Sequence, residues 1–289
     1  MQDAHGVARL LDAAAARMRS EPLRRGSSVW LPERGRVLLT GDLHDSTVHL
    51  GIVRALARLE RSPDNHLVLH ELIHGDRLVG GVDLSYRMLC RVAQLVLCHP
   101  GQVHVVLANH ELAQAFRHPV SKGAGDNLEL FDAGIEWAFG DDAPVVEEAI
   151  GRMVRAMPLA VRCLNGLMLS HSLPSPHELD GFDASVVDRE LSEADYALRS
   201  GSAWRMVWGR GWTTGQVAEL GALWGVRTFV LGHAFVEHGA EAPMPGLLLL
   251  NTDHERARAV AVDLAEPVPP ADELAMSSLP LASFIDRDG

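Results

Sequence analysis

The sequence has no long hydrophobic run, no signal-peptide pattern and no internal repeat at a fixed period. No apolar stretch approaches the roughly 18 residues that a membrane-spanning helix requires. Arg9, Asp12, Arg17 and Arg19 interrupt the N-terminal segment, where a signal peptide would need an apolar core. These absences argue against a membrane or secreted protein, and we expect a cytoplasmic location.

Cysteine and basic residues are also scarce. The three cysteines, Cys90, Cys98 and Cys163, are odd in number and stand in apolar contexts, so we expect reduced core residues. The 26 Lys and Arg residues are outnumbered by 38 Asp and Glu, which gives a net charge of -12. This balance disfavours binding to nucleic acid polymers or membrane surfaces. It is compatible with a phosphate substrate, because a metal ion can supply local positive charge.

What the sequence does contain is a series of short apolar runs, the first of which alternate with segments of helical spacing. Such alternation predicts a parallel sheet within an α/β fold. With 289 residues and 47% apolar content, the chain can bury a large core. We expect strands at 36–40, 67–69, 103–107, 159–163, 167–170, 228–231, 247–250 and 257–262, and helices at 3–20, 47–59, 83–97, 126–157 and 216–224.

The second half of the chain is expected to be less regular. Asn165-Gly166 suits a two-residue turn, so the apolar runs on either side of it predict a hairpin. A final hairpin is expected from residues 247–250 and 257–262. The segment 204–212 is rich in glycine, arginine and tryptophan, and we expect a loop there.

The domain organisation is expected to be simple. We expect one domain at 1–265, with a small helical cap inserted at about 120–158, whose many acidic residues form a solvated face. From residue 266 onward, prolines and acidic residues predict a flexible tail that ends at residue 289.

Polar residues of metal-ligand type follow five of the apolar runs. Asp42 and His44 come directly after 36–40, and side chains two apart in an extended segment point the same way. Open α/β sheets place ligands beyond the carboxyl ends of their strands, and a carboxylate with an imidazole suits a divalent metal. The recurrence of this pattern outweighs the alternative of isolated capping and surface residues. The residues are Asp42, His44, Glu71, Asn109, His110, Glu111, His171 and His233.

The order of these residues resembles the calcineurin-like metallophosphoesterase superfamily, in the branch of the serine/threonine phosphoprotein phosphatases and the diadenosine tetraphosphatases. The resemblance spans roughly residues 36 to 262, and the segment 206–210 resembles the family's tryptophan loop. It implies a four-layer α-β-β-α sandwich of two mixed sheets. The matching blocks are Gly41-Asp42-Leu43-His44, His70-Glu71, Asn109-His110-Glu111, Ser170-His171 and Gly232-His233.

The resemblance also implies a site with two divalent metal ions, with manganese first and iron or zinc as alternatives. His110 would be the general acid beside the leaving oxygen, with Glu111 in the same block. Asp42 and His44 would bind the first metal, Glu71 would bridge both, and Asn109, His171 and His233 would complete the second.

Three departures from the family pattern bear on catalysis. Glu71 replaces the bridging aspartate, which keeps a carboxylate but lengthens it by one methylene. His74 stands where the family has the acid that orients the general acid, and it could pair with His110 or act as a ligand. Gly75 stands where the family has a phosphate-binding arginine, and we expect Arg210 to replace it. The other two arginines considered for this role are Arg77 and Arg205.

The function that the resemblance implies is hydrolysis of a phosphomonoester, such as phosphoserine or phosphothreonine, by in-line attack of metal-bound water. The alternatives are a dinucleoside polyphosphate or other nucleotide hydrolase, and a catalytically degenerate metal-binding module. The partner would be a phosphorylated protein or small molecule, with no nucleic acid polymer and no membrane. The sequence carries no signal for an oligomeric state.

Overall fold

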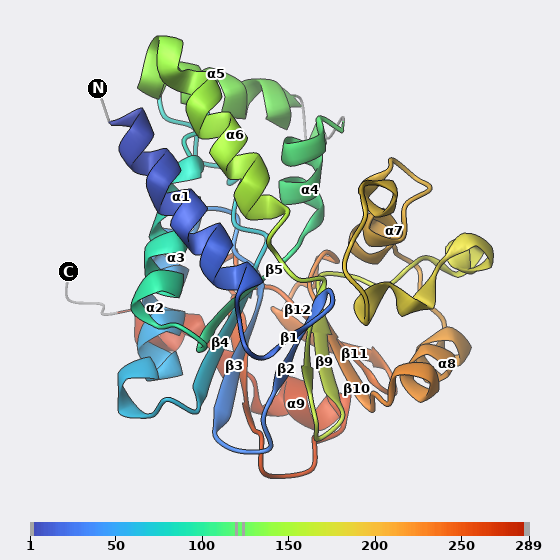
Figure 1. Cartoon of the computed structure of the whole chain (residues 1–289). Coiled ribbons are helices and arrows are strands. Elements are labelled where there is room, and N and C mark those ends of the chain that lie inside the picture. The colour runs from blue at the N-terminus through green and yellow to red at the C-terminus, as the bar shows by residue number, and fades with distance from the viewer. Residues whose placement is uncertain (1–2, 119–120, 123–124, 286–289) are drawn as a thin grey trace.

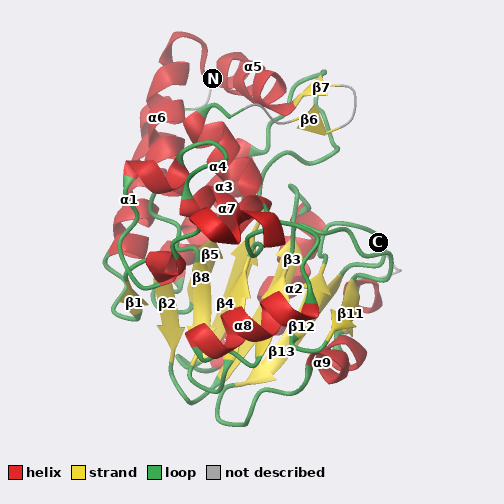
Figure 2. Cartoon of the chain, turned by 90° about the vertical axis from the view of Figure 1, so that its right-hand side faces the viewer, coloured by secondary structure: helices red, strands yellow, loops and turns green. Residues whose placement is uncertain are grey.

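Two mixed β-sheets pack face to face between helices in the computed structural model, which describes residues 3–118, 121–122 and 125–285 (Figures 1 and 2). The smaller sheet has the strand order β14-β13-β3-β4-β5, and the larger has β1-β2-β8-β9-β10-β12-β11. This arrangement confirms the predicted four-layer α-β-β-α sandwich. The strands of the smaller sheet are β3 (Arg36–Asp42), β4 (Asn65–His70), β5 (Val103–Val106), β13 (Arg258–Asp263) and β14 (Leu279–Pro280).

The smaller sheet places three strand ends side by side. Strands β3, β4 and β5 are parallel neighbours, whereas β13 runs antiparallel to β3. Along β3, Leu38 packs with the helices, and Val37 and Leu39 pack in the core between the sheets, as the two-residue period of a strand requires. Because both faces are covered, the strands are continuous apolar runs, and their carboxyl ends meet at one edge.

The larger sheet brings two further strand ends to the same region. Strands β9 and β10 are parallel, and β10 is also parallel to β12. The hairpin of β8 and β9 turns at Asn165-Gly166, as predicted, with φ of +96° at Gly166. The strands are β1 (Arg24–Arg25), β2 (Ser28–Leu31), β8 (Ala160–Cys163), β9 (Leu167–Ser170), β10 (Thr228–Leu231), β11 (Ala240–Met244) and β12 (Leu247–Leu250).

Helices cover the outer faces of both sheets. Helices α2 and α3 pack on the smaller sheet, and α8 lies across the larger one (Figure 2). Ser46 caps α2 by accepting the His49 N–H. The helices are α1 (Ala4–Arg19), α2 (Thr47–Ala57), α3 (Tyr86–Cys98), α4 (Asn109–Phe116), α5 (Asn127–Phe139), α6 (Ala143–Val154), α7 (Ser202–Trp208), α8 (Thr214–Trp224) and α9 (Ala271–Ser277).

The segment expected to form a helical cap does contain two helices, α5 and α6. Helix α6 packs against α1 and α4, and α5 packs against α6, so that together they extend one end of the molecule (Figure 1). A two-stranded ribbon of β6 (Ser121–Lys122) and β7 (Gly125–Asp126) precedes them.

Three local predictions of secondary structure were wrong, and of the three cysteines expected in the core only Cys163 is buried. Residues 247–250 and 257–262 do not form a hairpin, because β12 pairs with β11 and β13 pairs with β3 in the other sheet. Residues 202–208 form the helix α7 instead of a loop, since Ala203, Met206 and Val207 are buried on one face. Part of the segment expected to be a flexible tail forms α9, whose Ala271 and Leu274 are buried, and β14, which pairs with β13.

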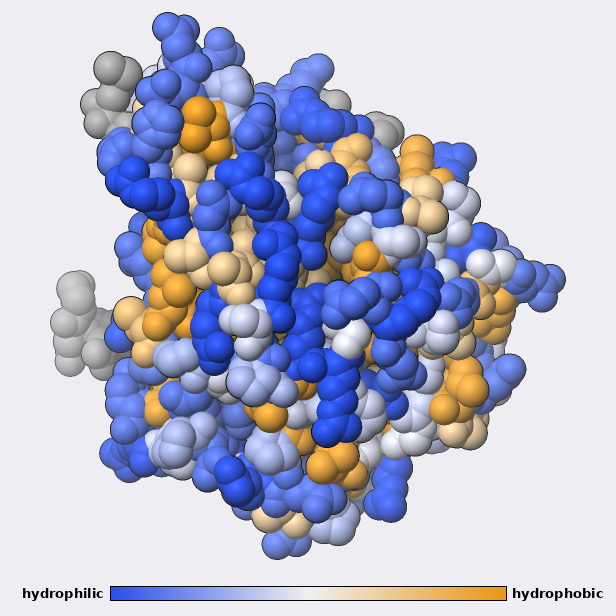
Figure 3. All heavy atoms as spheres, viewed as in Figure 1, coloured by the Kyte–Doolittle hydropathy of each residue, from blue (hydrophilic) through white to orange (hydrophobic). Residues whose placement is uncertain are grey.

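The surface seen in Figure 3 is mostly hydrophilic, with small apolar groups between the polar ones. Within the described ranges, Trp137, Phe235 and Met276 are the most exposed large apolar side chains, at 67%, 74% and 76%. No described helix combines the length and apolar character that a membrane crossing requires.

A buried histidine pair predicts that stability depends on pH. His66 Nδ1 lies 3.3 Å from His104 Nε2 on the neighbouring strands β4 and β5, and burial lowers the pKa of His104 to about 3. The unfolded chain takes up a proton on this residue near pH 6.5, whereas the folded chain does not. The free energy of unfolding should therefore fall by about 1.4 kcal/mol per pH unit from this residue as the pH drops from 6.5 towards 3.

The measurement is urea unfolding between pH 7 and pH 4. His104→Gln stays neutral throughout and should flatten the slope of stability against pH, whereas His177→Ala, an exposed residue, should leave it unchanged. Equal slopes in the unmodified protein and His104→Gln would contradict the prediction.

Candidate metal centre

Three strands of the smaller sheet end in buried polar side chains. Asp42 is the last residue of β3, Glu71 follows β4, and Asn109 begins α4 just after β5. Sharp turns follow the strands, since His44, Glu71 and His233 have φ of 41°, 51° and 59°. Side chains with a Cβ rarely adopt this left-handed backbone, and such residues gather at functional sites. The turns bring these side chains towards a common centre between the sheets.

His171, which follows β9, is the centre of the cluster. Its Nε2 lies 2.6 Å from Asn109 Oδ1, 2.8 Å from Glu71 Oε2 and 3.2 Å from His233 Nδ1. His233, which follows β10, lies 2.9 Å from Asn109 Oδ1 through its Nδ1. One carboxylate, one amide oxygen and two imidazoles from both sheets therefore meet at one point.

Asp42 lies beside this group. Both of its carboxylate oxygens accept the His233 N–H, at 3.0 and 3.1 Å, and its Oδ1 is 3.6 Å from His171 Nδ1. His44 Nδ1 lies 3.0 Å from the Ile73 carbonyl oxygen, so this nitrogen carries the proton and donates it. The Nε2 of His44 is then the nitrogen with a lone pair, which is the state of a metal-ligating histidine.

His70, a residue that was not predicted from the sequence to take part in the site, fixes the tautomer of His171. His70 is fully buried at the end of β4, and burial lowers its pKa to about 4, so it is neutral. Its Nε2 donates to the Thr40 carbonyl oxygen at 2.9 Å, and its Nδ1 therefore accepts from His171 Nδ1 at 3.0 Å. This bond leaves the lone pair of His171 on Nε2, which faces Asn109 and Glu71. The signal was available, because His70 directly precedes Glu71 at a strand end.

His110 and Glu111 lie at the N-terminus of α4 but have different surroundings. The backbone N–H of His110 donates to Glu71 Oε1 at 3.3 Å. The His110 ring contacts the rings of His44 and His74, with centroids 5.3 and 5.2 Å away. Glu111 Oε1 accepts the N–H groups of residues 72 and 73, at 2.6 and 3.2 Å. The Glu111 carboxylate therefore holds the loop after β4, and burial raises its pKa.

A cavity of about 310 Å³ opens onto this cluster. Arg210 lines it, with a guanidinium nitrogen 3.5 Å from His233 Nδ1, and burial lowers the pKa of Arg210. Arg205 instead donates to the Glu178 carbonyl oxygen at 3.1 Å. The residues that line the cavity are Asp42, His44, Glu71, Asn109, His110, Trp208, Arg210, His233, Phe235, Asn251 and Asp253.

Gly75 leaves no room for the arginine that stands at the corresponding position of the family that the sequence resembles. A Cβ atom at Gly75 would lie 2.4 Å from the His44 carbonyl oxygen, which is closer than real Cβ contacts. Any side chain there would force apart the two turns that follow β3 and β4. A cationic group for the cavity must therefore come from elsewhere in the chain, and of the candidates Arg210 is the one that lines the cavity.

The donor set fits divalent metal ions. Two groups have ligand atoms within 4.8 Å of one another, namely Asp42, His70 and His171, and Glu71, His171 and His233. Burial lowers the pKa values of His171 and His233, the latter to about 3, so both imidazoles are neutral and have lone pairs. Buried nitrogen and oxygen donors of this kind suit manganese, iron or zinc.

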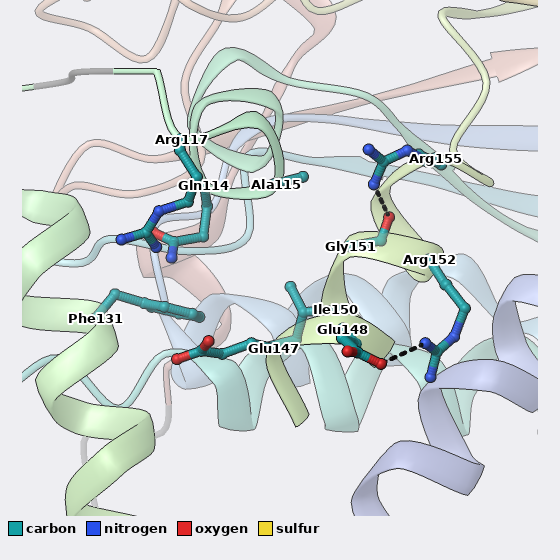
Figure 4. A pocket seen from close by; sticks show the side chains of 10 residues that line it. All are labelled: Gln114, Ala115, Arg117, Phe131, Glu147, Glu148, Ile150, Gly151, Arg152 and Arg155. Carbon is teal, nitrogen blue, oxygen red and sulfur yellow. Dashed lines mark hydrogen bonds and ion pairs between the residues drawn. The ribbon is translucent and has the colours of Figure 1, made fainter. Parts of the chain in front are cut away.

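A second cavity, of about 360 Å³, lies between α4, α5 and α6 and has a different chemistry (Figure 4). It is lined by arginines and glutamates, but its arginines are already paired. Arg117 bonds Asp132, Arg152 bonds Asp12, and Arg155 donates to the Gly151 carbonyl oxygen. Paired charges without histidine in the lining make this cavity a poor candidate for metal chemistry.

Comparisons with known proteins agree with this fold. No family model and no curated protein sequence matches the chain. A solved structure of a protein serine/threonine phosphatase from Saccharomyces cerevisiae, described as similar to human phosphatase PP5, is 14% identical with a TM-score of 0.68; the match covers 91% of this chain and 83% of that one. A cold-active protein-tyrosine phosphatase from a psychrophilic Shewanella is 13% identical with a TM-score of 0.56. This match covers 86% of this chain and 80% of that one. The chain therefore has the α/β sandwich fold of these phosphatases over most of its length.

Proposed function

We propose that this chain is a metal-dependent phosphoesterase of the calcineurin-like metallophosphoesterase superfamily that hydrolyses a phosphomonoester. The observation that carries the proposal is the convergence, in one cavity, of buried carboxylates and neutral imidazoles from both sheets, with Arg210 beside them. The fold shared with solved phosphatases supports the same conclusion. We propose that Asp42 and His44 hold one metal ion, that Glu71 contacts both, and that Asn109, His171 and His233 hold the second.

When bound, two divalent ions would polarise the phosphate and lower the pKa of a nucleophilic water. The chain's own residues supply the rest. The Arg210 guanidinium binds phosphate oxygens, which a planar fork of donors suits well. His110 donates a proton to the leaving oxygen. His70 and the Ile73 carbonyl group hold His171 and His44 in the tautomers that ligation requires.

A phosphomonoester such as phosphoserine or phosphothreonine is the substrate class that we favour. The neighbouring structures are described as phosphatases of proteins. A dinucleoside polyphosphate would need several cationic groups, yet Arg210 is the one Lys or Arg among the described residues that line the cavity. We further propose manganese as the metal, and a cytoplasmic location in which the three cysteines, free in the structure, stay reduced.

The test combines elemental analysis with turnover of p-nitrophenyl phosphate. The purified protein, incubated with Mn²⁺ and desalted, is expected to hold close to two ions and to hydrolyse this ester. His233→Ala should lower occupancy and reduce kcat/KM by about 10²–10³-fold, the loss typical of removing one preorganised electrostatic group. His177→Ala, at an exposed histidine, is the matched control and should change neither quantity. An unmodified protein that binds metal without any turnover would instead be the degenerate module.

A further inference from the structure

A buried aspartate and histidine adjoin the proposed general acid. His74 Nδ1 lies 2.9 Å from Asp83 Oδ2, and the two side chains are only 1% and 5% exposed. The other oxygen, Asp83 Oδ1, accepts the Ser85 N–H at 2.8 Å, and Ser85 Oγ accepts the His74 N–H at 3.0 Å. Because a carboxylate accepts hydrogen bonds, the proton of His74 is on Nδ1.

The opposite nitrogen of His74 is therefore an acceptor, and it faces no partner of its own. His74 Nε2 is buried without a hydrogen bond to any described residue. The ring of His110 is the adjoining polar group, with centroids 5.2 Å apart and planes inclined by 59°. At that separation the ring nitrogens can come within hydrogen-bond distance of each other. A buried acceptor without a partner is costly, so a small rotation of the His110 ring that brings one of its N–H groups to His74 Nε2 would be favourable.

Helix α5 holds this pair in place. The Phe131 ring stands edge-on against His74, with centroids 5.3 Å apart and planes at 81°. The Asp83 N–H donates to the Leu130 carbonyl oxygen at 3.0 Å. Gly134 packs so closely that a Cβ there would lie 1.8 Å from the Asp83 carbonyl oxygen. The pair is thus fixed on both sides, by its own loop and by a helix.

We propose that Asp83 is a positioning residue that acts through His74 to hold His110 for proton donation. This proposal rests on the proposed function, in which His110 is the general acid. The aspartate carboxylate fixes the His74 tautomer, and His74 Nε2 accepts one N–H of His110. The other N–H of His110 is then directed towards the leaving oxygen. The carboxylate that the family places beside the general acid is thereby replaced by a histidine with an aspartate behind it.

The chemical step is simple to balance. An attacking water oxygen bonds to phosphorus and loses a proton to solvent, while the bond from phosphorus to the leaving oxygen breaks with its electron pair on that oxygen, which takes a proton from protonated His110. Neutral His110 regains a proton from solvent water before the next turnover. Asp83 and His74 exchange no proton in this scheme, because their role is to fix the orientation of the His110 ring.

The test is the dependence of kcat on the leaving group, measured with a series of aryl and alkyl phosphates. In Asp83→Asn, kcat should fall about 10–100-fold for alkyl phosphates, the usual loss for an orienting partner, and less for p-nitrophenyl phosphate. The plot of log kcat against leaving-group pKa should become steeper. Ser85→Ala is the matched control, since it removes a bond to the His74 backbone and should keep the slope of the unmodified protein.

A second measurement does not need activity. Nitrogen-15 NMR of the histidine rings should find His74 protonated on Nδ1 in the unmodified protein. Protonation of His74 on Nε2, or identical slopes in Asp83→Asn and Ser85→Ala, would overturn the proposal. If Asp83→Asn fails to fold by circular dichroism, His74→Asn takes its place with the same expected steepening. An unmodified protein that turns over no phosphate ester would overturn the proposed function itself.

Discussion

Glu71→Gln is expected to empty both metal positions and to reduce kcat/KM by at least about 10²–10³-fold. A bridging carboxylate offsets the repulsion between two dications, and the neutral amide of glutamine does not. The substitution is nearly isosteric. It keeps an oxygen that can accept the hydrogen bond that the backbone N–H of His110 now donates to Glu71 Oε1 at 3.3 Å. The loss should therefore come from charge, not from packing. Metal content and turnover are measured on the same sample.

Two further variants decide whether Glu71 is the bridge. Asp76 is exposed in the loop after β4 and does not line the cavity, so Asp76→Asn should keep close to two ions per chain. Glu71→Asp introduces the residue found at this position in the family that the sequence resembles, and it should retain measurable activity. If Asp76→Asn empties the site while Glu71→Gln leaves it filled, the assignment of the bridge is wrong.

Removal of metal is expected to lower the melting temperature by roughly 5–10 °C. Ligands of the proposed site come from both sheets, so bound ions tie the sheets together in the folded state alone. A ligand at 100 times its Kd stabilises the folded state by about 2.7 kcal/mol, and 1 kcal/mol shifts Tm by about 2–4 °C in chains of this size class. Differential scanning fluorimetry with and without a chelator measures the shift.

The controls separate the site from general effects of the chelator. His171→Ala removes a ligand of the second ion alone, so chelator and Mn²⁺ should shift its Tm less than they shift the Tm of the unmodified protein. His177→Ala should show the full shift of the unmodified protein. A chelator that lowers the Tm of His171→Ala as much as that of the unmodified protein would place the stabilising ion elsewhere.

Much of the sheet could be predicted from sequence, because burial on both faces leaves a visible trace. The runs at 37–39 and 67–69 are continuously apolar, and each stops abruptly at a polar residue. The change from apolar to polar residues marks the end of the strand. It also identifies the polar residues that lie at that end. Asp42, Glu71 and Asn109 could therefore be predicted to lie at strand ends, and in the structure they line one cavity.

The pairing of strands and the supporting residues could not be predicted in the same way. Strands β12 and β13 are close in sequence but belong to different sheets. β13 pairs with β3, which is far from it in the chain, so the local sequence does not indicate its partner. Asp83 was predicted to begin a helix at 83–97, but α3 begins at Tyr86, and Asp83 lies in the irregular segment before it, where no period marks a side chain as buried. Its relation to His74 depends on the close approach of Gly134, which only the packed structure reveals.

The spread of the site over two sheets also orders events during synthesis. The His233 N–H that Asp42 accepts is 191 positions further along the chain. Domains fold as units while the ribosome extends the chain from its N-terminus, so a nascent chain that ends before β10 lacks part of the site. Such a chain can form β3, β4 and β5 but cannot complete the proposed metal centre. Incomplete nascent chains would therefore be unable to hydrolyse phosphate esters. The proposed phosphoesterase activity would begin only after the larger sheet has packed against the smaller one.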